Sequence, residues 1–187
     1  MMPRVAVIGA GLIGRSWSIV FARAGWDVAL FDVAADAIEQ ARAMVVGGLA
    51  ELKEHGLIDD AKAAAKRVRI SSSLADALDG AGFVQENTLE TIDCKRAMFA
   101  DLDRLATPDA ILASSTSTIV ASLFTESLEG RHRCLVAHPV NPPHLVPLVE
   151  LVGAPLTAPR PSPRPRRFTK HSARCRSSSS ARSRASS

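Results

Sequence analysis

A histidine and a carboxylate flank the stretch "PVNPPHLVPLV", at His138 and Glu150. Imidazole is a suited general acid or base near neutral pH, and a carboxylate beside it would orient the ring and stabilise its charged form. Prolines this dense forbid a helix and fix the intervening chain as a shaped loop. The pattern predicts an acid/base pair brought together by a loop, although on spacing alone a structural histidine is equally plausible.

Hydroxyl groups gather in a second stretch, "SSTS", at residues 114–117. A hydroxyl there could donate a hydrogen bond to the oxygen of an alcohol or ketone while a histidine takes or gives the proton. Oxidation of an alcohol also needs a hydride acceptor. These residues therefore predict redox chemistry only beside a cofactor such as a nicotinamide.

A glycine-rich turn, "GAGLIG", supplies the expected cofactor site through Gly9, Gly11 and Gly14. It follows an apolar strand and opens a helix, the context that makes G-x-G-x-x-G informative. Gly9 permits a tight turn, Gly11 lets the backbone approach a pyrophosphate, and Gly14 lets the helix pack close to the strand. The helix start at Leu12 and Ile13 would offer free N–H groups to the phosphates, so a glycine turn without a ligand is disfavoured.

Asp32 ends the second expected strand, where a carboxylate accepts hydrogen bonds from the ribose hydroxyls of a dinucleotide. A carboxylate there repels a 2′-phosphate, and no arginine follows in "DVAAD". NAD is therefore favoured over NADP. The alternative is that Asp32 only caps the following helix.

Alternating strands and helices must position these residues. They predict an α/β fold, a Rossmann-type doubly wound parallel sheet whose ligands bind at the carboxyl ends of the strands. In the helix at 91–106, Ile92, Met98, Leu102 and Leu105 are expected to form the apolar face. Strands are expected at 4–9, 27–32, 67–71, 82–87, 110–116, 133–138 and 145–152, and helices at 12–25, 34–66 (one or two), 74–81 and 91–106.

The net charge of +4 does not describe the whole chain evenly. Nine of the 23 basic residues follow Pro159 and all 19 acidic residues precede it, so residues 1–158 carry 14 basic against 19 acidic groups, a net charge of −5. Residues 159–187 are rich in Arg, Ser and Pro and lack periodicity, and we expect this basic tail to be disordered. Its abrupt start suggests an out-of-frame tail. Nucleic-acid binding by a genuine basic tail is disfavoured because no aromatic residues are interleaved.

Cysteine usage and hydropathy narrow the class further. Cys94, Cys134 and Cys175 are odd in number and lack CxxC spacing, so neither a disulfide framework nor a zinc or other metal site is indicated. A reducing, cytoplasmic location is the default. No apolar run reaches the roughly 18 residues that suggest a membrane span, and the N-terminus lacks a signal-peptide layout.

The motifs "GLIGRSW", "SSTS" and "VAHPVNPP…PLVEL" together resemble the 3-hydroxyacyl-CoA dehydrogenases, especially their lambda-crystallin and L-gulonate 3-dehydrogenase branch. The resemblance covers about residues 4–158. It implies an NAD-binding domain over 1–158 and NAD-dependent oxidation of an L-3-hydroxy substrate, a 3-hydroxyacyl-CoA or a hydroxy acid such as L-gulonate. Carnitine 3-dehydrogenation and a non-catalytic or inactive NAD-binding fragment are the alternatives.

The resemblance also implies roles for single residues. His138 and Glu150 match the family's acid/base pair, and Ser117 matches the serine that hydrogen-bonds the substrate oxygen. Asn141 matches an asparagine near the substrate and nicotinamide. Family members continue with a helical domain that forms a homodimer and closes the active site, and we expect this domain to be missing from this chain.

Two charged residues of "QENTLETIDCK", Glu90 and Lys95, match positions that contact NAD in the family. The alternative is a solvated charge pair at a helix end. The chain departs from typical acyl-CoA members by reading Ser115-Thr116-Ser117 where they read Asn-Thr-Ser. This departure favours the lambda-crystallin-like branch and weakens an acyl-CoA substrate.

Overall fold

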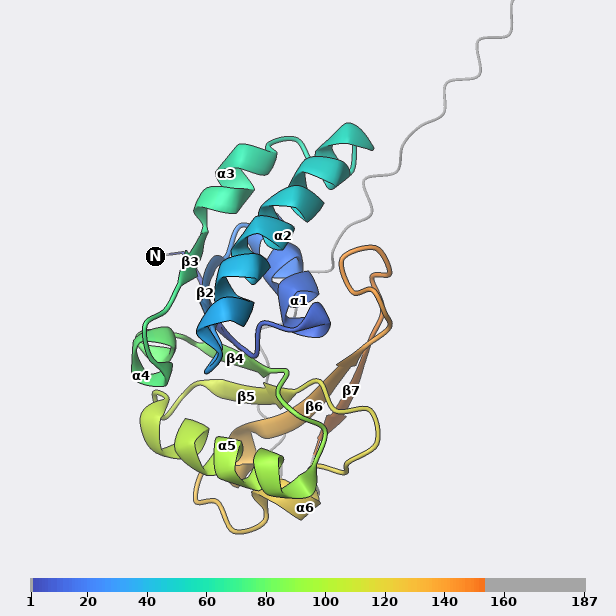
Figure 1. Cartoon of the computed structure of the whole chain (residues 1–187). Coiled ribbons are helices and arrows are strands. Elements are labelled where there is room, and N and C mark those ends of the chain that lie inside the picture. Colours follow the sequence, from blue (N-terminus) through green and yellow to red (C-terminus); the bar gives the residue numbers. More distant parts are fainter. Residues whose placement is uncertain (1, 154–187) are drawn as a thin grey trace, which may run out of the picture.

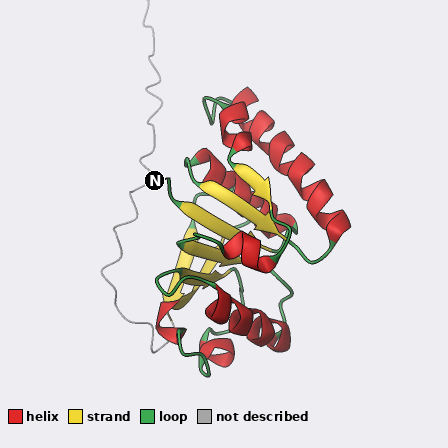
Figure 2. Ribbon diagram, turned by 90° about the vertical axis from the view of Figure 1, so that its left-hand side faces the viewer, coloured by secondary structure: helices red, strands yellow, loops and turns green. Residues whose placement is uncertain are grey.

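The computed structural model describes residues 2–153, which form a seven-stranded sheet with helices on both faces (Figures 1 and 2). The strand order is β3-β2-β1-β4-β5-β6-β7, and every neighbouring pair is parallel except β6 and β7. The order reverses between β1 and β4, the kind of point at which doubly wound sheets bind ligands. The strands are β1 (Arg4–Ile8), β2 (Asp27–Phe31), β3 (Val68–Ile70), β4 (Phe83–Glu86), β5 (Ile111–Ser114), β6 (Cys134–Pro139) and β7 (Val149–Gly153).

Two hydrophobic cores lie on opposite faces of this sheet. Alternate residues of β1 point to opposite sides, so Val5 and Val7 pack with α1 and α2 while Ala6 and Ile8 pack with α4, α5 and α6. Burial on both faces explains why β1 is apolar throughout rather than alternating. The helices are α1 (Leu12–Arg23), α2 (Ala35–Glu54), α3 (Ala61–Lys66), α4 (Leu74–Leu78), α5 (Ile92–Leu105), α6 (Ser122–Thr125) and the 3₁₀ helix η1 (Arg131–Arg133).

The predicted doubly wound α/β fold is confirmed, but the expected strand at 145–152 is wrong in its first half. Residues 145–148 belong to a loop, and β7 begins only at Val149. Within this loop the N–H groups of Leu145 and Val146 both donate to the carbonyl of Pro142. β7 then returns antiparallel to β6 because so short a connection cannot make a parallel crossover.

The buried face of α5 matches the expected one only in part: Leu102 is buried and Met98 packs against the core, as expected. Lys95, Phe99 and Leu102 are buried, whereas Ile92 and Leu105 are exposed. These three buried positions follow helical spacing, so the periodicity is present, but one of its members is a lysine. Hydropathy alone does not select a lysine for the core.

The tail predicted at 159–187, with Cys175, lies outside the described residues, as does the expected domain boundary at 158. Among residues 2–153, no helix is long and apolar enough to cross a membrane.

Candidate functional site

The antiparallel pairing of β6 and β7 brings His138 and Glu150 together. The two residues are direct cross-strand partners, and His138 Nδ1 lies 3.0 Å from Glu150 Oε2. A carboxylate only accepts hydrogen bonds, so the contact places the proton of a neutral ring on Nδ1 and leaves the Nε2 lone pair available. The His138 side chain is 31% exposed and that of Glu150 is 68% exposed. The pair is therefore accessible to a reactant.

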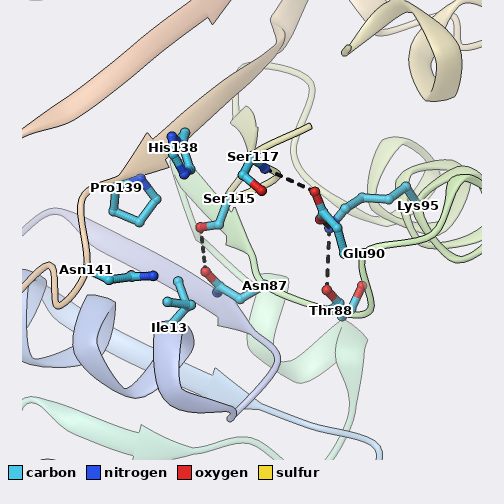
Figure 3. A pocket seen from close by; sticks show the side chains of 10 residues that line it. All are labelled: Ile13, Asn87, Thr88, Glu90, Lys95, Ser115, Ser117, His138, Pro139 and Asn141. Carbon is cyan, nitrogen blue, oxygen red and sulfur yellow. Dashed lines mark hydrogen bonds and ion pairs between the residues drawn. The ribbon is translucent and has the colours of Figure 1, made fainter. Parts of the chain in front are cut away.

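A cavity of about 240 Å³ opens beside His138 at the carboxyl ends of β4, β5 and β6 (Figure 3). It gathers residues from the glycine-rich turn, from the segment after β4 and from the loop after β6. Figure 3 shows Asn141 and Ile13 on the side away from Lys95. The cavity is lined by Ile13, Asn87, Thr88, Glu90, Lys95, Ser115, Ser117, His138, Pro139 and Asn141.

A second cavity, of about 340 Å³, lies beside the first, and both are lined by His138 and Ser117. The second cavity also touches Glu150 and is otherwise lined by uncharged side chains of β6, β7 and the segment 116–122. His138 and Ser117 therefore stand between the two spaces. A molecule in one cavity could meet a molecule in the other at these side chains.

Lys95 lies at the edge of the first cavity and is only 1% exposed. Its Nζ donates to both carboxylate oxygens of Glu86, at 3.0 and 2.9 Å, and lies 3.5 Å from Glu90 Oε2. Glu86 is fully buried and also accepts from the hydroxyl of Ser114 at 2.6 Å. A solvated charge pair is therefore the wrong description of Lys95. The lysine is buried, and its charge and the charge of buried Glu86 compensate each other.

Glu90 binds the "SSTS" segment. One of its carboxylate oxygens accepts from the Thr116 hydroxyl and from the backbone N–H of Ser117, the latter at 3.0 Å. Burial is the largest single influence on the pKa of Glu90 and raises it, but the hydrogen bonds from Thr116, Ser117 and Thr118 and the charge of Lys95 together lower it below its usual value. Glu90 thus stands ionised at the cavity wall and fixes the backbone of Ser117.

The glycine-rich turn has the geometry that a dinucleotide needs. Gly9 has φ +94°, and a Cβ there would lie 2.6 Å from the carbonyl oxygen of Asn87. A Cβ on Gly14 would lie 1.8 Å from the carbonyl oxygen of Gly9. A Cβ on Gly11, by contrast, would enter open space. No side chain caps the start of α1 and no acidic residue lies in its first turn, so the space before Leu12 suits phosphate groups.

Asp32 lies next to this turn. Its Oδ2 accepts from the N–H of Ala10 at 2.6 Å, and its Oδ1 accepts from the N–H of Ala34 at 2.9 Å. The residue that caps α2 is Ala34, without a side-chain hydrogen bond, so Asp32 is not the helix cap of the alternative interpretation. Each carboxylate oxygen keeps a further lone pair that could accept from a ribose hydroxyl.

Sequence reasoning missed a hydrogen-bond network beneath the first cavity. The Ser115 hydroxyl accepts from Trp17 Nε1 at 3.0 Å and from Gln85 Nε2 at 2.7 Å, and it donates to Asn87 Oδ1 at 2.7 Å. It also missed Glu86, the partner of Lys95. The available signal was the polar run "QEN" at the end of an apolar strand, because buried polar groups need partners.

The chain matches known proteins over most of its length. The family described as "3-hydroxyacyl-CoA dehydrogenase, NAD binding domain" matches residues 4–174. A lambda-crystallin homolog of Rattus norvegicus is 40% identical over 158 residues, 83% of this chain and 50% of that protein. An L-carnitine dehydrogenase of Streptomyces griseus is 38% identical over 156 residues, 83% of this chain and 46% of that protein.

Solved structures agree with these matches. A 3-hydroxybutyryl-CoA dehydrogenase from Escherichia coli K12 superposes with a TM-score of 0.79 at 29% identity, over 84% of this chain and 34% of that one. The chain spans about half the length of the curated relatives it matches. Its glycine-rich turn and Asp32 fit the NAD that the matching domain binds. The chain belongs to the 3-hydroxyacyl-CoA dehydrogenase family, of whose sequence it carries the NAD-binding domain.

Proposed function

We propose that this protein oxidises the hydroxyl group of an L-3-hydroxy substrate to a 3-keto product, with NAD as cofactor. The observation that carries the proposal is the His138–Glu150 pair, 3.0 Å apart, at a cavity that also receives Ser117. Bound NAD would supply the hydride acceptor. His138 Nε2 takes the hydroxyl proton, Glu150 stabilises the ring as it becomes charged, and the Ser117 hydroxyl donates to the substrate oxygen.

The cofactor would lie along the sheet edge from the glycine-rich turn to His138. The start of α1 near Gly11 would receive the phosphates and Asp32 the adenosine ribose. The first cavity, between Ile13 and the Glu90–Lys95 side, is left for the nicotinamide half. Residues 1–158 would form the NAD-binding domain, and the homodimer expected from the resemblance stays a prediction.

The second cavity is the place for the rest of the substrate. Apart from His138 and Glu150, the described residues that line it carry no charge, so the lining offers no lysine or arginine to a substrate carboxylate or phosphate. The hydroxyl groups of Thr116, Thr118 and Ser122 could hydrogen-bond a polar substrate chain. A 3-hydroxyacyl-CoA, L-gulonate and L-carnitine are all candidates, the last because a relative is named for it.

NAD binding without turnover is a second candidate, and the exposure of β7 favours it. All five residues of β7 are exposed, and Glu150 on this strand is open to water. Water screens the attraction between the Glu150 carboxylate and a charged imidazole, so Glu150 stabilises the charged ring less. Turnover by this chain would then be poor even where NAD binds.

The test is a His138→Gln variant of the full chain. We expect it to lose about 10²–10⁴-fold in turnover, the usual contribution of general acid–base catalysis, while NAD affinity in a direct binding titration is unchanged. Reduction of NAD would be followed with a 3-hydroxyacyl-CoA, L-gulonate and L-carnitine. His132→Gln, at an exposed histidine outside both cavities, is the matched control.

Each result distinguishes the candidates. Turnover that survives in the His138→Gln variant would show that another group is the base. NAD binding by the unchanged chain without turnover on any of the three substrates would favour the second candidate. Failure to bind NAD would contradict both.

A further inference from the structure

The loop between β6 and β7, residues 140–148, is fastened to α1 by two polar contacts that the proposed chemistry does not use. His144 Nδ1 lies 3.1 Å from Ser16 Oγ. Arg23 donates from Nη1 to the backbone carbonyl of His144 at 2.7 Å. Figure 1 shows this loop in orange, on the side of the molecule where α1 lies. One histidine thus holds the loop through both its side chain and its carbonyl.

The direction of the Ser16 contact follows from its neighbours. The Ser16 hydroxyl donates its one proton to the carbonyl of Leu12 at 3.0 Å. Its oxygen must therefore accept from His144, which places a proton on Nδ1 of that ring. This contact needs a donor at Nδ1, and it does not need a charged ring.

The charges around His144 favour the neutral ring. Burial, as the largest cause, lowers the pKa of His144 below its usual value, and the positive charge of Arg23 on α1 lowers it further. Glu51 on α2 acts in the opposite sense and raises it. At neutral pH the ring is uncharged and donates from Nδ1. Protonation would add a second positive charge beside Arg23.

The fastened loop connects the two halves of the site. It carries Asn141, on the wall of the first cavity, and its ends continue into the strands that hold His138 and Glu150. The N–H of Val140 donates to the carbonyl of Leu148 at 3.0 Å and closes the loop at its base. The helix that the loop contacts, α1, begins at the glycine-rich turn, where the cofactor phosphates are expected.

We propose that His144 is a positioning residue, which holds the 140–148 loop against α1 so that Asn141 and the His138–Glu150 pair keep a fixed place relative to the cofactor. Its effect on turnover rests on the proposed function; its effect on the loop does not. The direction in which this contribution of His144 changes with pH follows from proton binding. A folded-state pKa below the unfolded value means that the contribution of His144 is complete above about pH 6.5 and declines as the pH falls through the folded-state value.

The experiment compares His144→Ala, His144→Asn and Leu145→Ala in the full chain. Asparagine places an amide N–H where Nδ1 lies but does not titrate, and Leu145 is an exposed residue of the same loop. Hydrogen exchange would be measured at the amides of Val140, Leu145 and Val146, as protection factors between pH 7.5 and 5. Loss of one net hydrogen bond in His144→Ala should lower protection at pH 7.5 by about 3- to 10-fold.

His144→Asn should retain the protection of the unchanged chain at pH 7.5 and keep it at pH 5, where the unchanged chain loses part of its own. Leu145→Ala should match the unchanged chain at both pH values. Equal protection in His144→Ala and Leu145→Ala would overturn the proposal, as would a failure of His144→Asn to restore protection.

Turnover gives a second readout. Where the unchanged chain turns over, His144→Ala should lower kcat by a similar factor without changing NAD affinity, and His144→Asn should restore it. Absence of turnover in the unchanged chain would count against the proposed function, while the exchange data would still decide the role of His144.

Discussion

Two pairs of titratable side chains, both near the carboxyl ends of the strands, have opposite environments. Lys95 and Glu86 are almost completely buried, and Lys95 donates to both oxygens of the carboxylate. His138 and Glu150 share one contact, and their side chains are 31% and 68% exposed. A buried pair cannot change its charge without a large cost, whereas an exposed pair can exchange protons with a substrate at little cost to the fold. The buried pair therefore belongs to the scaffold, and the exposed pair suits the proton transfer of the proposed function.

The largest expected effect is on the buried pair. Lys95→Met leaves the fully buried carboxylate of Glu86 without its cation, and we expect a loss of about 3–5 kcal/mol in the free energy of unfolding. Urea denaturation at pH 7 would measure it, and Lys62→Met, at an exposed lysine of α3, is the control. The double variant Glu86→Gln/Lys95→Met should recover part of the loss. A single variant within about 0.5 kcal/mol of the unchanged protein would show that Glu86 is not held by Lys95.

Glu90 is expected to contribute less to stability than the buried pair and more than the exposed pair. Glu90→Gln removes a charged acceptor of four hydrogen bonds at an exposed position, so we expect a loss of about 1 kcal/mol in the free energy of unfolding at pH 7. The lowered pKa of Glu90 means that its contribution is complete above the unfolded value of about 4.3 and is lost as the pH falls through the folded-state value. Thermal unfolding of both proteins from pH 7 to pH 3 would measure this. A stability difference that stays constant over this range would contradict the assignment.

The fold was more predictable from the sequence than the site was. The apolar pattern locates most of the strands. The spacing of Gly9 and Gly14 predicts a tight turn, and the structure shows that a Cβ at either position would clash. The order of residue types does not reveal the register of the β6–β7 hairpin. The sequence could therefore suggest that His138 and Glu150 act together, but it could not show that they are cross-strand partners. Lys95 and Ser115 were harder still, because burial of a polar side chain depends on partners from distant segments, Glu86 for one and Trp17 for the other.

The smallest effect on stability is expected at the exposed pair. Glu150→Gln removes a charge that is largely open to water, and the free energy of unfolding should change by less than about 0.5 kcal/mol. Under the proposed function the same change lowers turnover by about 10²-fold, the lower end of general acid–base effects, because the amide cannot stabilise a charged imidazole. Urea denaturation and NAD reduction assays on one preparation would measure both quantities. A large loss of stability together with unchanged turnover would show that the His138–Glu150 pair has a structural role and not the proposed catalytic one.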